Sequence, residues 1–284
     1  MKMKIKLAKK YINTFFKVQV QMALIVGAIA FFTLTACTPQ SDKLYNEAYQ
    51  EIENGHFRIA ISLLEQSAKL EKNDKKKTKA LIEAARISRF EIQDFERALR
   101  LYREVILKSQ DSKQRISAQE AVAEINLENL QNYNQALSEL LILEQLNLSG
   151  EQKDKIKLRI AQAQFLTGNS STALEYVDSA LKTSTPDRKY FLKLKAEVLM
   201  ATQKRDEALL IYEELRKLDE IYFSDENLYI ATSIALEEKE DYVGALSYLE
   251  KYKTKVKDLS YLELREKRLK EKVVNKPLSK GRRK

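Results

Sequence analysis

The sequence holds few of the residues from which catalytic, metal and disulfide sites are usually built. Among its 284 residues are one cysteine, one histidine, three prolines, six glycines and no tryptophan. A single cysteine excludes a disulfide within the chain, and His56 has neither a cysteine nor a second histidine with which to share a metal ion. The chain also lacks a glycine-rich phosphate loop and a nucleophile motif near His56. We therefore predict a protein that is not an enzyme and needs no cofactor, with His56 in a turn.

Helix breakers are almost absent from the body of the chain. From Leu44 to Asp258 there are only four glycines and one proline, in a composition rich in leucine, alanine, glutamate, lysine and glutamine. These residues favour helix almost everywhere, and no alternation of apolar and polar residues suggests a strand. The composition predicts an all-α fold.

The net charge of +9 is concentrated at the two ends of the sequence. The first 36 residues hold six lysines and no acidic residue, so the remainder carries +3, and five basic residues in the last nine positions leave the body at −2. A nucleic-acid partner would need basic residues gathered on one folded face, so we predict none. The tail 275–284 and the Lys75-Lys76-Lys77 run have two open interpretations, as contacts to anionic lipid or as solvated segments.

The N-terminal segment is typical of a secretion signal, with positive, apolar and small residues in that order. Its apolar stretch, Met22 to Leu34, is 13 residues long, whereas a membrane-spanning helix needs roughly 20. The run Leu34-Thr35-Ala36-Cys37 that follows resembles the lipobox of bacterial lipoproteins. The resemblance implies that the signal peptide 1–36 is removed and that Cys37 carries covalent lipid, followed by a tether, 37–43. The long basic region before Met22 leaves an uncleaved inner-membrane anchor as an alternative.

The body of the chain repeats one pattern six times. In each copy a turn of aromatic or polar residues is followed by an alanine, an apolar residue and, three positions later, a large apolar residue. The alanines are separated by 38, 38, 37, 35 and 37 residues, and such a period indicates a repeat architecture. The six alanines are Ala60, Ala98, Ala136, Ala173, Ala208 and Ala245.

This pattern resembles the tetratricopeptide repeat (TPR), a helical hairpin whose first helix carries a small residue twelve positions before the alanine. Ala48, Ala161, Ala196 and Ser233 match that position. Ala85 and Ala123 lie one position earlier, which predicts turns one residue longer in the second and third repeats. The resemblance implies a right-handed α-solenoid of about six hairpins over residues 44–258, in which neighbouring hairpins stack into one core and need a terminal cap.

The predicted cap is a helix over residues 259–274. Leu262 and Leu269 share its inner face, and the charged residues between them, Arg265 and Glu266 included, are expected to face mostly outward. Loops between repeats are predicted near residues 73, 111, 149, 185 and 224. Three helix starts support them: Ser149 with Gln152 as a capping box, Thr185 with Pro186 at the first helical position, and Ser224 before Asp225 and Glu226.

The resemblance also implies a partner-binding groove lined by the first helix of each hairpin. Its carboxylate clamp for the terminal carboxylates of chaperones is only half present, because Lys155 and Arg159 match one pair while Glu120 and Glu124 replace the cation and amide of the other. The groove positions transferred to this chain are Tyr45, Tyr49, Arg86, Arg89, Glu120, Glu124, Lys155, Arg159, Gln162, Lys193 and Glu197.

A lipid anchor combined with TPR-like hairpins is similar to the bacterial TPR lipoproteins that assist outer-membrane protein assembly, pilus and secretin biogenesis or the recruitment of peptidoglycan enzymes. The likeness implies a scaffold that binds envelope proteins or peptide segments. Thr38 stands where aspartate would signal inner-membrane retention, which predicts the periplasmic face of the outer membrane. The alternatives are an inner-membrane anchored, chaperone-like TPR protein and an undetected cell-wall enzyme.

Overall fold

The computed structural model describes residues 39–183 and 186–275. The predicted signal peptide, Cys37, Thr185 and the tail from residue 276 lie outside these ranges. Within them the chain forms fourteen α-helices and no strand, which confirms the all-α class. None of these helices is long and apolar enough to cross a membrane.

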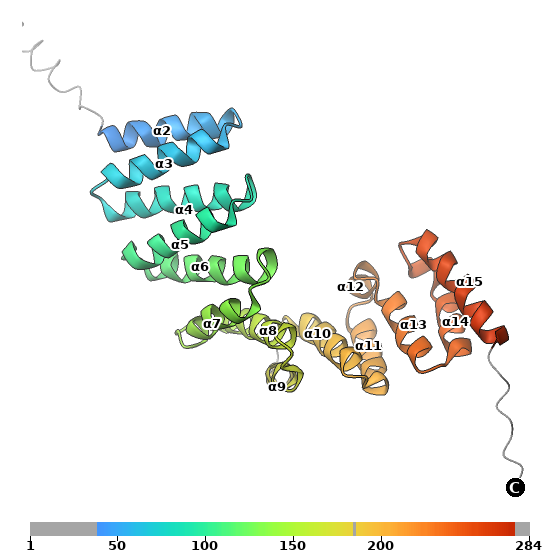
Figure 1. Ribbon diagram of the computed structural model, residues 1–284. Helices are drawn as coiled ribbons and strands as arrows, with labels where there is room; N and C mark the ends of the chain where they lie inside the picture. The colour runs from blue at the N-terminus through green and yellow to red at the C-terminus, as the bar shows by residue number, and fades with distance from the viewer. Residues whose placement is uncertain (1–38, 184–185, 276–284) are drawn as a thin grey trace, which may run out of the picture. The chain divides into compact units, whose positions relative to one another are not determined.

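The chain divides into two compact units, Met1–Gln93 and Asp94–Lys284. The first unit contains α2 (Gln40–Glu53), α3 (Phe57–Leu70) and α4 (Asp74–Phe90). Helix α2 packs on α3, and α3 packs on α4 (Figure 1). Helix α2 begins at Gln40, so it includes four residues that the sequence analysis assigns to the tether. Ser41 is buried in this unit, and the Asp42 and Lys43 amides donate to the Pro39 carbonyl at 3.0 and 3.1 Å, so these residues form the first turn of the helix.

The second unit begins at α5, so the boundary between the units falls inside the second predicted repeat. Its successive helices form hairpins, in which α8 packs on α9, α10 on α11 and α13 on α14. The elements of this unit are α5 (Phe95–Lys108), α6 (Ser112–Glu124), the π-helix η1 (Ile125–Asn129), α7 (Tyr133–Glu144), α8 (Gly150–Leu166), α9 (Ser170–Leu181), α10 (Arg188–Ala201), α11 (Arg205–Leu218), α12 (Glu220–Asp225), α13 (Leu228–Glu238), α14 (Tyr242–Lys251), the 3₁₀-helix η2 (Lys253–Lys255) and α15 (Leu259–Asn275).

The small residues that define the repeat are buried in every copy. All six anchoring alanines are 0% exposed, and their partners on the first helices are between 0% and 1% exposed. Two helices approach closely only where small side chains meet at the crossing. The large residues Tyr102 and Tyr212 are buried as well, as the pattern predicts. The partners are Ala48, Ala85, Ala123, Ala161, Ala196 and Ser233.

Every repeat also turns through the same backbone conformation. Five positions before each anchoring alanine the chain adopts a positive φ, which glycine tolerates and other residues adopt at a cost of about 1 kcal/mol. Only two of the six copies use glycine there, so the turn is set by the helices that it joins. The six residues are Gly55 (75°), Gln93 (54°), Gln131 (54°), Gly168 (88°), Gln203 (63°) and Glu240 (59°).

The extra residue in the second and third repeats is accommodated in two different ways. Between α4 and α5 the connection has four residues, against three in the first repeat, which confirms the longer turn. In the third repeat the connection keeps three residues, and the prediction is wrong there. The end of the first helix instead widens into η1, where the Leu130 amide donates to the Ile125 carbonyl, five residues back, at 2.9 Å. A π-helix absorbs one added residue in this way.

One of the three predicted helix starts is confirmed, and two are wrong. Ser149 and Gln152 form the capping box. Helix α10 begins at Arg188, so Pro186 lies in the preceding turn and is not the first helical residue. Ser224 does not begin a helix either, because it lies inside α12. That short helix forms because the Asp219 side chain accepts a hydrogen bond from the Tyr222 amide, at 2.9 Å, and because Phe223 is fully buried.

The terminal helix α15 packs on α14 (Figure 1). Leu262 and Leu269 are fully buried, as predicted, but Arg265 and Glu266 are only 6% and 8% exposed. Their outward placement in the sequence analysis is therefore wrong. The reason is Glu237 on α13, whose Oε2 accepts a hydrogen bond from Arg265 at 2.6 Å and so draws a charged side chain of α15 into the interface.

Candidate partner-binding face

Seven of the predicted groove residues lie on three first helices of the second unit, α6, α8 and α10. Helices α8 and α10 contact each other directly, and Arg159 on α8 forms an ion pair with Glu124 on α6, so the solvent-accessible residues of these helices form one surface, which we call the first-helix face. The structure brings onto it Glu120, Glu124, Lys155, Arg159, Gln162, Lys193 and Glu197.

Charges on the α6–α8 part of this face neutralise one another. Nη2 of Arg159 lies 2.7 Å from Glu124 Oε1, and its Nη1 lies 3.6 Å from Glu128 Oε1. Burial raises the pKa of Glu120, with Glu124 adding to the rise while Lys155 and Arg159 oppose it. Arg159 is thus already engaged by two carboxylates, so this part of the face does not offer a cluster of cations to a partner's carboxylates.

A pocket of about 160 Å³ opens between α8, α10 and α12, and we call it the α8–α10 pocket. The rings of Tyr190 and Tyr222 meet edge to face in its wall, with centroids 5.4 Å apart and planes at 82°. Aromatic pairs favour this arrangement, and tyrosine combines a large apolar body with a polar tip. The pocket therefore offers an aromatic and aliphatic lining with polar groups beside it. Its lining is Leu158, Gln162, Tyr190, Lys193, Leu194, Glu197 and Tyr222.

Lys193 organises the polar side of the α8–α10 pocket. Its Nζ lies 2.9 Å from Glu226 Oε2 and 3.4 Å from Glu197 Oε1. Burial lowers the pKa of Lys193, but the hydrogen bonds and charges of the two glutamates outweigh that effect and raise it. Burial also raises the pKa of Tyr222, so its hydroxyl stays protonated. One ammonium faces two carboxylates here. A second, Lys189, lies over the Tyr190 and Tyr222 rings and is paired with Asp219 at 2.8 Å, so one net negative charge remains beside the aromatic wall.

The remaining predicted residues belong to the first unit. The hydroxyl of Tyr45 donates to that of Tyr49 at 3.1 Å, and burial followed by this hydrogen bond raises the pKa of Tyr49 to about 12. Arg86 pairs with Glu83 on its own helix, at 2.7 Å. Arg89 is 8% exposed, so little of it can be reached by a partner.

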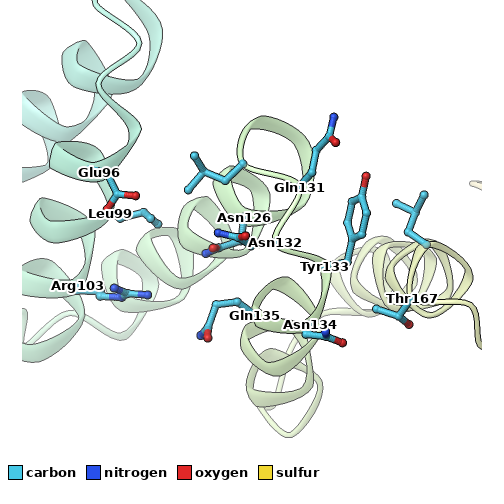
Figure 2. Close-up of a pocket in the computed structure, with 12 residues that line it drawn as sticks. Glu96, Leu99, Arg103, Asn126, Gln131, Asn132, Tyr133, Asn134, Gln135 and Thr167 are labelled. Atoms are coloured by element: carbon cyan, nitrogen blue, oxygen red, sulfur yellow. The ribbon is translucent and has the colours of Figure 1, made fainter.

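A larger cleft of about 710 Å³ lies where α5, η1 and the start of α7 meet. It contains none of the predicted site residues. Figure 2 shows amide side chains around it, among them Gln131, Asn132 and Gln135, together with the ring of Tyr133. Amides both donate and accept hydrogen bonds, so the cleft can bind polar groups such as peptide backbone or hydroxyls. Asn126, on η1, is buried at its floor and donates to the Val122 carbonyl at 2.8 Å.

His56 lies in the turn between α2 and α3, as the sequence predicts. Its Nδ1 is 2.7 Å from Glu51 Oε2, and the side chain is 58% exposed. Within residues 39–183 and 186–275, no three histidine, cysteine, aspartate or glutamate side chains are grouped as metal ligands would be.

Sequence reasoning missed both tyrosines of the α8–α10 pocket. Tyr190 precedes Lys193 by three residues and Glu197 by seven, which places all three on one helical face. Extending the groove positions by one turn would have found it. Tyr222 carries no such signal, because α12 lies outside the repeat pattern.

Known structures resemble this chain in fold. No protein-family model matches the sequence, and no curated protein matches it. A tetratricopeptide repeat protein from Parabacteroides merdae aligns with 83% of this chain and 87% of its own, with a TM-score of 0.61 and 17% identity. The apo form of RapI aligns over 87% and 80%, with a TM-score of 0.59 and 12% identity. Pseudomonas aeruginosa pilF aligns over 82% and 97%, at 0.52 and 14%.

The chain has a tetratricopeptide-repeat fold. At these identities the likeness establishes the fold alone, because one fold serves many functions.

Proposed function

We propose that this protein is a lipid-anchored TPR scaffold that binds segments of other proteins in the bacterial cell envelope. The observation that carries the proposal is the α8–α10 pocket, because it combines an aromatic wall with polar groups on the face where the sequence analysis predicts a groove. Binding hot spots are typically tyrosine-rich pockets of this kind, surrounded by polar residues.

The pocket chemistry defines the kind of segment that would fit. A volume of about 160 Å³ accommodates one side chain, and the lining by Leu158, Leu194 and the two tyrosines favours an apolar one. The negative charge of Glu197 and Glu226 exceeds the positive charge of Lys193. A basic residue next to the side chain that enters the pocket would therefore be attracted. We infer a partner segment in which an apolar residue is flanked by lysine or arginine.

The anchor in this proposal is lipid on Cys37, following the lipobox resemblance. Only Thr38 and Pro39 separate Cys37 from the first residue of α2, a span of at most about 10 Å. The first hairpin would then stay close to the lipid head groups. Holding a binding face near the membrane raises the effective concentration of a bound client toward other envelope proteins. The predicted location is the periplasmic face of the outer membrane.

Site-specific photo-crosslinking in cells tests the pocket. A photoreactive amino acid replaces Tyr190 in the full-length chain, and the matched control replaces Leu210, which is 73% exposed on the second helix α11. We expect a distinct set of crosslinked envelope proteins at position 190 that is missing at position 210. Identical crosslinks at both positions, or none at either, would refute a partner at this pocket.

Metabolic labelling with palmitate tests the anchor. We expect label in the wild type and none in Cys37→Ala, which should also lose its membrane association. A Cys37→Ala protein that stays bound to the inner membrane without label would support the uncleaved anchor instead. The crosslinking result is independent of this outcome, because it reports on the second unit only.

A further inference from the structure

The connection between α3 and α4, together with the first turns of α4, is the most basic stretch of the described first unit. The eight positions 72–79 hold five lysines and one acidic residue, Asp74, and Glu71 directly precedes them. We call these lysines the lysine turn. All but Lys77 belong to the exposed class. The lysine turn consists of Lys72, Lys75, Lys76, Lys77 and Lys79.

Hydrogen bonds hold the start of α2 against the lysine turn. The Ser41 hydroxyl donates to Glu71 Oε2 at 2.9 Å, and Ser67 donates to the Ser41 carbonyl at 2.7 Å. Lys76 Nζ donates to both carboxylate oxygens of Asp42, at 2.7 and 2.8 Å. Figure 1 shows that α2 begins at the end of the unit where α3 joins α4. The lysine turn and the point where the chain enters the fold are therefore neighbours.

The lysine turn keeps a surplus of unpaired positive charge. Lys76 is paired with Asp42, which raises the pKa of this lysine. The Glu71 carboxylate accepts hydrogen bonds from the Asn73 amide and from Ser41, which lower its pKa. In the described ranges no carboxylate lies within ion-pair distance of Lys72, Lys75 or Lys77. These three ammonium groups are available to an external anion.

We propose that the lysine turn rests on anionic lipid head groups and acts as a second membrane contact beside the anchor. This inference rests on the proposed anchoring at Cys37. The chain from Cys37 to Gln40 spans at most about 10 Å, which is close to the Debye length at physiological ionic strength. Lysines so near a charged membrane are attracted to it, and a lipid anchor with a basic patch binds more durably than either signal alone.

Depth-dependent fluorescence quenching tests the contact in the protein purified from membranes. A fluorophore is attached at Leu70→Cys, beside the lysine turn, or at the matched control Ile59→Cys; both side chains are about half exposed on α3. Eleven residues separate the two sites, or roughly 16 Å along the helix. The vesicles contain a lipid with a quencher on its head group and about one third phosphatidylglycerol. We expect stronger quenching at position 70 than at position 59.

The lysines are tested by the variant Lys72→Gln, Lys75→Gln, Lys77→Gln. The difference in quenching between positions 70 and 59 should disappear in this variant, at high salt, and in vesicles of phosphatidylcholine alone. A control variant that removes the same charge elsewhere, Arg58→Gln with Lys217→Gln and Lys251→Gln, should keep it. Equal quenching at both positions in the wild type, or a difference that survives the triple substitution, would overturn the inference.

Co-sedimentation separates this inference from the anchor proposal. If Cys37 carries no lipid, wild-type chain should still pellet with phosphatidylglycerol vesicles at least about tenfold better than the lysine-turn variant. Equal pelleting of the two would reject the lysine turn, whatever the state of Cys37. Loss of palmitate label with unchanged co-sedimentation would reject the anchor and leave the lysine turn standing.

Discussion

The two ends of the described chain use charged helical residues in opposite ways. At the N-terminal end, Lys76 and Asp42 form a pair whose side chains are 55% and 29% exposed. At the C-terminal end, Arg265 and Glu237 form a pair whose side chains are 7% and 8% exposed. Both pairs join residues about 30 positions apart in the sequence. The difference is that α15 covers the second pair and nothing in the described first unit covers the first.

Coverage by a helix thus determines whether a charged side chain stabilises the fold or stays accessible to a partner. Glu237 is surrounded by three cations of α15, because Lys272 lies 2.6 Å and Arg268 3.3 Å away in addition to Arg265. Glu266, on the same helix, lies 3.3 Å from Lys253. Buried ion pairs are costly to break, whereas exposed pairs contribute little to stability.

Removing the buried carboxylate should have the largest effect. Glu237→Ala leaves Arg265 buried without its partner, and breaking a buried pair costs about 3–5 kcal/mol. We expect urea denaturation, followed by circular dichroism, to show an early loss of helix from α13 to α15. The matched control Glu238→Ala replaces the adjacent, more exposed carboxylate, which pairs with Arg205, and should change much less. Equal losses in the two variants would contradict a structural role for Glu237.

Acid should weaken the same interface. Burial raises the pKa of Glu237, but hydrogen bonds from Lys272 and Arg265 outweigh it, and the net pKa lies below the ordinary value of 4.5. A carboxylate with a lowered folded-state pKa stabilises the fold above its unfolded pKa and loses that contribution as the pH falls through the folded value. The melting-temperature difference between wild type and Glu237→Gln should therefore shrink below about pH 4.5. A difference that stays constant down to pH 3 would exclude this carboxylate as the cause.

Replacing Ser233 should have a smaller effect on stability, and in the stabilising direction. Its hydroxyl is buried without a hydrogen-bond partner among the described residues, at the position where the other five repeats have alanine. An unsatisfied buried polar group costs about 1–3 kcal/mol. Ser233→Ala should thus raise the stability of the second unit by about 1 kcal/mol, measurable as a higher urea midpoint. Ser88→Ala is the control, because that hydroxyl donates to the Ala84 carbonyl at 2.7 Å and its removal should gain nothing.

The repeat itself could be predicted because each copy carries its own signal. Small residues at a fixed period have one physical role, the close crossing of two helices, and the burial of all twelve follows from it. The longer second turn was also predictable from spacing. In the third repeat the same spacing led to η1, since an added residue fits either in a turn or in a widened helix and the local sequence does not choose between them.

Features that depend on distant residues could not be predicted from local pattern. Arg265 and Glu266 belong to a charged helix that resembles a solvated one, and only Glu237 and Lys253, on other elements, draw them inward. Tyr222 reaches the α8–α10 pocket from α12, a helix outside the repeat. The predicted groove residues on α8 and α10 lie together because they belong to the repeat, where position along the helix fixes the face; that a partner binds there stays a prediction.

The exposed pair at the N-terminal end gives the last and smallest effect on stability. Asp42→Asn removes the partner of Lys76, and the melting temperature should stay within measurement error, because exposed pairs contribute little. The same change adds one net positive charge to the surface formed by the lysine turn, so binding to phosphatidylglycerol vesicles should strengthen. A clear loss of stability without a gain in vesicle binding would mean that the pair serves the fold, and the contrast between the two ends would be lost.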